Sequence, residues 1–460
     1  MALRTPRPDS PLPWRHALAA ALLALAAMTV MVGAHPPAGP PESDARFYSR
    51  LALGVTDFGV YGEYRGASQT PTPAMEVLPL YPLLVAALVR VDDGLGDSLR
   101  CALGSRDASR CARDYGLLVR VQTALLAAAA WLVWLTAWTW TRRVDVAWLA
   151  LLAAGVAGVL PEFASAALTE NLSLPLGGLL MLGLAGLLRG VRVARAVPML
   201  GVALGLLALT RPSYWYLLLA VAAVAALLCA VPRWRPRGLP LALAAALGLA
   251  LVSPWLARNW LVFDTPAISA GPYGGRTLIQ RVTYNDMRVD EFAAAFIYWL
   301  PDFGDSLARA LLPATSYRRL GWEDDSFYRE SVRRVHRALR AGPGATDLGR
   351  LLREDVLGRP LAHARATLAL AWRGMFIGKS WGLVAWLCAL VVGLRAWRAG
   401  SRSLALLFAP ALFLCLFQAA VSVSIPRYNL LLLTPLALVM ALQLAQGLER
   451  WRAGRAGPGR

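Results

Sequence analysis

Lysine and histidine are the scarcest functional side chains in this 460-residue chain. Lys379 is the only lysine, and the four histidines lie far apart at positions 16, 35, 336 and 363. A P-loop requires a lysine behind a glycine-rich turn, and neither that motif nor GxGxxG or HExxH occurs. These absences argue against energy coupling by a nucleotide and against a histidine-based metal site.

Cysteine is also scarce, with five residues in all. Cys101 and Cys111 fall in a polar stretch, whereas Cys229, Cys388 and Cys415 fall in apolar ones. If the polar stretch faces an oxidising periplasm, Cys101 and Cys111 can form a disulfide. Two free thiols are the alternative, and the sequence does not choose between the two states.

Long apolar runs, in contrast, are abundant. Hydrophobic residues make up 57% of the chain and the mean hydropathy is +0.49, far too apolar for a soluble protein of this length. Runs of about 18 or more apolar residues are typical of transmembrane helices. The sequence therefore predicts an all-α polytopic membrane protein with about ten transmembrane helices, in a range of roughly nine to thirteen. The predicted spans are 17–34, 116–140, 145–161, 168–188, 198–210, 212–231, 239–256, 380–397, 403–424 and 428–447.

Two of these assignments have an alternative. Residues 198–231 could form one long helix, but Arg211-Pro212 in the middle favours two short helices with a polar apex outside the membrane. The N-terminus resembles a signal peptide, with Val32-Gly33-Ala34 as a cleavage site. Its apolar run is longer than a usual signal core, which favours an uncleaved first helix.

The formal net charge of +19 follows the predicted topology. The predicted cytoplasmic segments hold 18 basic and three acidic residues, while residues 35–115 and 258–378 hold 23 of the 28 acidic residues. Basic residues retained in the cytoplasm are the positive-inside pattern. The pattern predicts cytoplasmic termini and two long periplasmic loops on a bacterial inner-membrane protein. Because topology explains the charge, we expect no nucleic-acid partner.

The spans divide the chain into five parts: the N-terminal tail with the first helix (1–34), the first periplasmic loop (35–115), spans two to seven (116–257), the large periplasmic loop (258–378), and the last three spans with the cytoplasmic tail (379–460). The first loop is predicted to hold a membrane-surface helix over 43–57 and a short apolar helix ending at Val91, re-entrant or interfacial. The second is predicted to hold amphipathic helices over 290–312 and 326–339, followed by a turn over 340–346.

Acidic residues at the predicted outer membrane face are the first candidates for chemistry. Asp44 follows the first span, Glu162 ends the third, and Glu170 begins the fourth. A carboxylate near the hydrocarbon edge is costly unless it is paired or functional. Asp44 and Glu170 facing one cavity could hold a divalent metal ion or act as a general base. The alternative is an interfacial carboxylate in contact with water or headgroups.

Basic residues at the same predicted face are the second group of candidates. Arg211, Arg258 and Arg427 lie at the mouths of spans, and Lys379 precedes the eighth. Arginine suits bidentate binding of a phosphate group. Snorkelling toward the headgroups is the alternative explanation.

Several short segments, in this order along residues 17–447, resemble the C-type (GT-C) glycosyltransferase superfamily of membrane enzymes. The similarity is greatest to its family-39-like branch, which includes protein O-mannosyltransferases and the lipid A aminoarabinose transferase. The segments are Asp44-Ala45-Arg46-Phe47-Tyr48, Leu78-Pro79-Leu80-Tyr81-Pro82-Leu83-Leu84, Leu168-Thr169-Glu170-Asn171, Leu209-Thr210-Arg211-Pro212, Ser253-Pro254-Trp255-Leu256-Ala257-Arg258-Asn259-Trp260 and Ile425-Pro426-Arg427-Tyr428.

The resemblance implies roles for individual residues. Asp44 matches the catalytic acid of the first outer loop, and Glu170 matches the second acid. Arg211 and Arg258 match recurrent positions near the carrier phosphate, and Tyr81 is added to the predicted substrate contacts. The chain departs from the pattern in two places: Ser43-Asp44 has one acid where the family commonly has two, and Glu76-Val77-Leu78 lacks the basic residue found before the Pro-Leu-Tyr segment.

The function implied by the resemblance is inverting transfer of a sugar from a polyprenyl-phosphate donor to an acceptor at the periplasmic face. The acceptor would be a glycan, a lipid or a protein, and membrane lipids would surround the enzyme. No cofactor is required by the pattern, although a divalent metal ion at Asp44 and Glu170 stays an option. Two alternatives stay open: a transporter or flippase of lipid-linked sugars, and an O-antigen polymerase or ligase.

Overall fold

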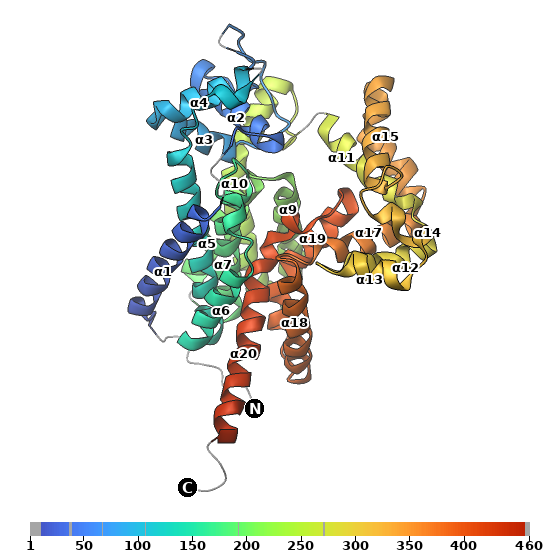
Figure 1. The fold of residues 1–460 in the computed structure, drawn as a ribbon. Helices are drawn as coiled ribbons and strands as arrows, with labels where there is room; N and C mark the ends of the chain where they lie inside the picture. The colour runs from blue at the N-terminus through green and yellow to red at the C-terminus, as the bar shows by residue number, and fades with distance from the viewer. Residues whose placement is uncertain are drawn as a thin grey trace. The chain divides into compact units, whose positions relative to one another are not determined.

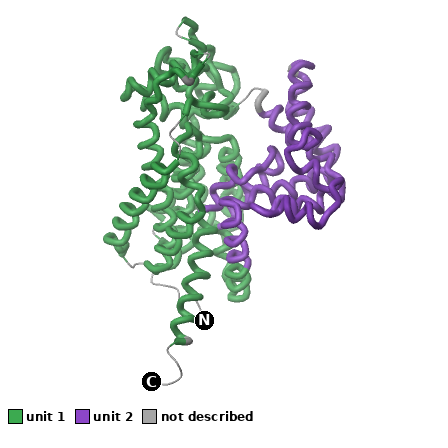
Figure 2. The backbone as a smooth tube through the Cα atoms, viewed as in Figure 1, with its two compact units in different colours: residues 1–269, 391–407, 434–460 green, residues 270–390, 408–433 purple. Residues whose placement is uncertain are grey.

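The computed structural model describes residues 11–35, 39–66, 68–105, 107–191, 193–269 and 272–455. Within these ranges every regular element is a helix, and one isolated β-bridge joins Gly62 and Pro73. It forms two compact units, residues 1–269 with 391–407 and 434–460, and residues 270–390 with 408–433 (Figures 1 and 2). The predicted all-α fold class is confirmed.

Eight helices of the described chain are long and apolar enough to cross a membrane, and three shorter apolar helices accompany them. The long ones are α1 (Trp14–Gly33), α5 (Gly116–Thr141), α7 (Glu170–Leu188), α9 (Pro212–Ala230), α10 (Arg235–Phe263), α18 (Ser380–Arg398), α19 (Ser403–Val421) and the run Pro426–Ala453, which joins η7 (Pro426–Leu432) to α20 (Leu433–Arg455). The short ones are α3 (Leu80–Val91), α6 (Val144–Val156) and α8 (Val193–Ala208). The chain is a multi-pass membrane protein.

Each of the ten predicted spans coincides with a helix, but two of these helices, α6 and α8, are shorter than a full span. The segment predicted over 145–161 is helical only as α6, because Gly158 adopts a positive φ and the chain then turns into η2 (Pro161–Phe163). The segment 198–231 is two helices, as Arg211-Pro212 predicts. Arg211 has an extended backbone and is the residue before α9.

The first unit packs its helices through small residues. Gly201 and Gly205 lie on α8 against α10, and a Cβ atom on either would stand 2.7 Å from Ala244 O or 2.9 Å from Gly248 O. Close backbone approach of this kind is how apolar helices associate where lipid supplies no hydrophobic driving force. The contact fixes α8, and therefore the position of Arg211 just beyond its end.

Residues 43–114 form a small helical layer at one end of the first unit (Figure 1). Its elements are α2 (Ser43–Phe58), α3, α4 (Asp93–Gly104) and η1 (Ala108–Arg110). The helix predicted over 43–57 is present as α2, but its apolar side is covered by protein, with Leu51 and Leu53 fully buried. Leu51 and Leu53 are therefore covered by α3 and α4 and do not face a membrane. A position of α2 at the membrane surface stays a prediction.

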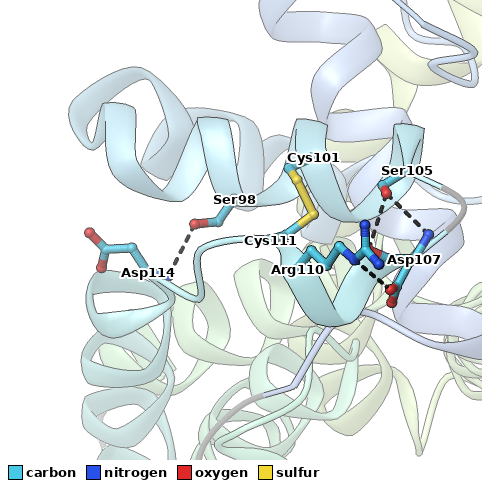
Figure 3. Close-up of a disulfide and its surroundings, with 7 residues drawn as sticks. All are labelled: Ser98, Cys101, Ser105, Asp107, Arg110, Cys111 and Asp114. Carbon is cyan, nitrogen blue, oxygen red and sulfur yellow. Dashed lines mark hydrogen bonds and ion pairs between the residues drawn. A yellow bond between two sulfur atoms is a disulfide. The ribbon is translucent and has the colours of Figure 1, made fainter.

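Two links fasten this layer. Arg100 on α4 donates two hydrogen bonds to Asp57 on α2, at 2.8 and 3.0 Å, and this bonding holds the pKa of the Asp57 carboxyl below its usual range. Cys101 and Cys111 form a disulfide across the turn that follows α4 (Figure 3). The remaining cysteines, at positions 229, 388 and 415, are free.

The second unit contains the large loop and short helices packed around two buried clusters. Its additional elements are α11 (Pro272–Val282), η3 (Thr283–Asp286), α12 (Val289–Tyr298), α13 (Gly304–Leu311), α14 (Ala314–Tyr317), η4 (Arg318–Leu320), α15 (Phe327–Ala341), η5 (Pro343–Thr346), α16 (Leu348–Leu351), η6 (Leu352–Leu357) and α17 (Pro360–Gly374). The single helix predicted over 290–312 is wrong. Pro301 and the left-handed backbone of Asp302 divide it into α12 and α13. The helix predicted over 326–339 is confirmed as α15, and the predicted turn coincides with η5.

We predict that Gly201→Val and Gly205→Val lower the thermal stability of the detergent-solubilised protein. The added side chain must push α8 away from α10, and overpacking of this kind costs about 1–3 kcal/mol. Gly155→Val on α6 is the matched control, because a Cβ atom there meets nothing within 4 Å. Equal melting temperatures for all three variants would contradict the proposed α8–α10 contact.

A thiol count tests the disulfide and the predicted orientation together. In whole cells that are acid-quenched and denatured, a maleimide mass tag is expected to label Cys229, Cys388 and Cys415, and all five cysteines only after reduction. The reason is that a disulfide persists only where the compartment is oxidising. Five tags without reduction would place this layer in a reducing compartment.

Candidate active site

Glu170 begins α7 and is fully buried. Thr169 precedes it, and the Thr169 hydroxyl donates a hydrogen bond of 3.4 Å to Glu170 Oε2. The N-terminus of a helix carries partial positive charge from its unpaired N–H groups, which favours a carboxylate at this position. The helix end therefore explains part of how a buried acid is tolerated here.

Arg211 supplies the opposite charge. Its Nη1 donates to Glu170 Oε1 at 3.2 Å, and its side chain is only 16% exposed. Arg211 is placed by the break between α8 and α9, which the following Pro212 enforces. The Leu80 amide, at the start of α3, bonds to the Leu209 carbonyl at 3.0 Å, so the same break also anchors the first loop.

Tyr48 links Asp44 electrostatically to Glu170 and Arg211. Asp44 and Tyr48 lie one helical turn apart on α2, which places them on one face of the helix. Burial raises the pKa of the Tyr48 hydroxyl, the Arg211 charge opposes this, and the charges of Asp44 and Glu170 add to it. A side-chain hydrogen bond links Tyr48 to Thr169. We call Asp44, Tyr48, Thr169, Glu170 and Arg211 the Tyr48 cluster.

Tyr81 packs against the Tyr48 cluster. Its ring stands edge-on to Tyr48, with centroids 5.6 Å apart, and its hydroxyl donates to Gln122 Oε1 at 2.5 Å. Asn171 Nδ2 donates to the same oxygen at 3.0 Å, and Gln122 Nε2 donates to the Ala164 carbonyl at 2.7 Å. Tyr81 is fully buried, so in this structure its role is to pack against Tyr48 and hold that ring in place.

Arg258 lies on α10 and fastens a different segment. Its guanidinium donates to the Ala74 carbonyl at 2.8 Å and to the Tyr61 carbonyl at 3.4 Å. Burial raises the pKa of the Tyr61 hydroxyl, Arg258 opposes the shift, and Tyr48 adds to it. Tyr61 therefore interacts electrostatically with both Arg258 and Tyr48.

The remaining predicted residues lie on other elements. Arg427, in η7, is half-buried, and Lys379 is exposed with a left-handed backbone; both belong to the second unit. Glu162, in η2, is exposed and is not among the groups acting on Tyr48. Predicted roles for Arg427 and Lys379 in phosphate binding stay predictions.

The side chains at the proposed metal site, Asp44 and Glu170, do not form a suitable set of metal ligands. Within the described residues, no group of three or more histidine, cysteine, aspartate or glutamate side chains is arranged to hold a metal ion. Glu170 already pairs with Arg211. We therefore derive no step through a metal ion.

The arrangement combines three chemical capacities. Asp44 offers an exposed carboxylate, Arg211 offers a positioned cation, and Tyr48 offers a hydroxyl whose pKa burial raises. Sequence reasoning missed Tyr48 and Tyr61. The spacing of Asp44 and Tyr48 in a predicted helix was the signal for Tyr48, whereas nothing local marks Tyr61.

No family model matches the sequence, and no curated protein matches it. Among solved structures, the crystal structure of ArnT from Cupriavidus metallidurans bound to undecaprenyl phosphate is similar to this chain. The similarity covers 95% of this chain and 79% of that chain, with 15% sequence identity and a TM-score of 0.40. A likeness this distant transfers neither residue roles nor a ligand.

We predict that Arg211→Met destabilises the protein more than Glu170→Gln does. Removing the arginine takes a partner from a fully buried carboxylate, and breaking a buried ion pair from one side costs about 3–5 kcal/mol. The double variant is expected to be more stable than Arg211→Met alone, since the unpaired charge is gone. Melting temperatures in one detergent check this order, and additive losses would contradict coupling between the two side chains.

Proposed function

We propose that this protein is a membrane glycosyltransferase. It takes a sugar from a polyprenyl-phosphate donor and passes it to a glycan, lipid or protein acceptor at the periplasmic face. The reaction inverts the configuration at the transferred carbon. The Tyr48 cluster is the proposed active site.

The convergence of Asp44, Glu170 and Arg211 is the observation that carries this proposal. The three residues come from α2, from the start of α7 and from the residue before α9, and Tyr48 interacts with each of them. Glu170 is fully buried at the start of the apolar helix α7, where a charge is costly to maintain for stability alone. A transfer that deprotonates a polar acceptor and releases a lipid-linked phosphate uses a base and a cation, which are the groups that Asp44 and Arg211 offer.

The proposed reaction is a single displacement. Asp44 accepts the proton of the acceptor hydroxyl while the acceptor oxygen bonds to the anomeric carbon. The bond between that carbon and the phosphate oxygen breaks on the opposite face, and its electron pair leaves with the polyprenyl phosphate. Arg211 stabilises the negative charge that develops on the phosphate.

Glu170 and Tyr48 are assigned supporting roles. Glu170 is buried and bonded to Arg211, so it fixes the direction of the guanidinium and does not itself reach the acceptor. A tyrosine hydroxyl is protonated at neutral pH, and burial raises the pKa of Tyr48 further. The Tyr48 hydroxyl is therefore suited to orient the acceptor or a phosphate oxygen beside Asp44.

We predict that Asp44→Asn lowers sugar transfer by about 10²–10⁴-fold, the usual contribution of a general base. The assay measures transfer from synthetic polyprenyl-phosphate sugars in membranes with matched protein levels. Glu162→Gln is the control, because it neutralises another exposed carboxylate outside the Tyr48 cluster.

The outcomes separate the candidate functions. Equal transfer by wild type and Asp44→Asn would remove Asp44 as the base and contradict the proposed displacement. Flipping of the lipid-linked sugar without transfer from any donor would favour the transporter. Transfer from diphosphate-linked oligosaccharides alone would favour a polymerase or ligase.

A further inference from the structure

The helix α15 in the second unit carries five arginines and one acid. Its exposed arginines recur every three or four residues, which aligns them on one face. They are Arg329, Arg333, Arg337 and Arg340. Glu330 is the one acid of α15, and it is shared by Arg333, Arg334 and Arg337 at 3.0, 3.3 and 2.6 Å. Among the described residues, no ion pair joins Arg329 or Arg340 to an acidic side chain.

The opposite face of α15 is already covered by protein. Phe327 and Ser331 are fully buried, Phe327 stacks on Tyr284 with ring centroids 5.2 Å apart, and Val335 packs against a cluster that includes α11. A helix that lies in a membrane interface inserts its apolar face among the acyl chains. That face is not available on α15, so the arginine face is a surface for a ligand that arrives from water.

An aromatic pair stands at the beginning of α15. Trp322 is 64% exposed, and its ring lies edge-on to Tyr328 with centroids 5.0 Å apart. The Arg373 guanidinium lies 5.9 Å from the Trp322 ring and 5.3 Å from the Trp299 ring. The pair is therefore held by neighbours, with much of the Trp322 ring open to solvent. Arg333 Nη1 donates to the Asp324 carbonyl at 2.8 Å, which places the arginine face beside the segment that carries Trp322.

We propose that Trp322, Tyr328 and the four exposed arginines form a binding surface for an anionic glycan. The apolar face of a sugar ring packs on an aromatic ring, while carboxylate or phosphate groups along the glycan pair with the guanidinium groups. Four arginines over three helical turns match a chain of repeated charges better than a single small anion. That this glycan is the acceptor rests on the proposed function; the binding itself does not.

The test measures binding to the full-length protein in nanodiscs of phosphatidylcholine. A fluorescent oligogalacturonate is expected to bind, and a neutral maltooligosaccharide of equal length is not. Replacing Arg329, Arg333, Arg337 and Arg340 by Gln is expected to weaken oligogalacturonate binding about tenfold or more. The matched control replaces Arg398, Arg450, Arg452 and Arg455, which are four exposed arginines outside this surface.

A second variant separates stacking from charge. Trp322→Ala is expected to weaken binding of oligogalacturonate and to leave binding of inorganic polyphosphate unchanged, because polyphosphate has no ring to stack. An equal loss for both probes would overturn the aromatic part of the proposal.

Other results would overturn the proposal as a whole. These are unchanged oligogalacturonate binding in the four-Gln variant, an equal loss in the control, or arginine-dependent binding only to phosphatidylglycerol vesicles, which would make lipid headgroups the partner. Asp44→Asn is expected to bind oligogalacturonate like wild type. Asp44→Asn therefore tests the proposed reaction, and the four-Gln variant separately tests glycan binding by this surface.

Discussion

The buried ion pair between Glu170 and Arg211 is the interaction on which the proposed site depends. A carboxylate with no solvent exposure persists only if a cation and hydrogen-bond donors compensate it. Arg211, the Thr169 hydroxyl and the N-terminus of α7 provide this compensation. Because each comes from a fixed helix end, the pair also holds the start of α7 beside the break between α8 and α9.

Helix packing in the first unit makes that pairing possible. Gly201 and Gly205 let α8 approach α10 at backbone distance, so the end of α8 is set by backbone contacts and not by adjustable side chains. The Leu80 amide then bonds to Leu209, which ties the first loop to the same point. Tyr48 and Asp44 arrive on α2, which α3 and α4 hold in place. Tyr48 then interacts electrostatically with Asp44 and with both members of the buried pair.

The two units use charge in different ways. In the first, few ionisable groups are buried, and those of the Tyr48 cluster lie at helix ends where a polar ligand could be met. In the second, arginines dominate. Arg281 is fully buried and bonded to Asn285, Thr367 and backbone carbonyls, with no acid as partner among the described residues, whereas α15 displays its arginines to water. A buried arginine satisfied by neutral acceptors organises the core of the unit, and the exposed ones leave a surface with unbalanced charge.

The sequence by itself determined the helical class, the positions of the ten apolar segments and the break at Arg211-Pro212, because hydrophobic run length and proline stereochemistry act locally. It also singled out Asp44, Glu170 and Arg211 as charges in an apolar setting. Only the tertiary structure decided that Glu170 pairs with Arg211, that Tyr48 and Tyr61 join this region, and that Arg258 holds the Tyr61–Ala74 backbone. These contacts link residues far apart in the chain, and their partners are chosen by helix packing, which leaves no local pattern. The same reason explains why α2 rests on α3 and α4 although its amphipathic pattern equally suits a membrane surface.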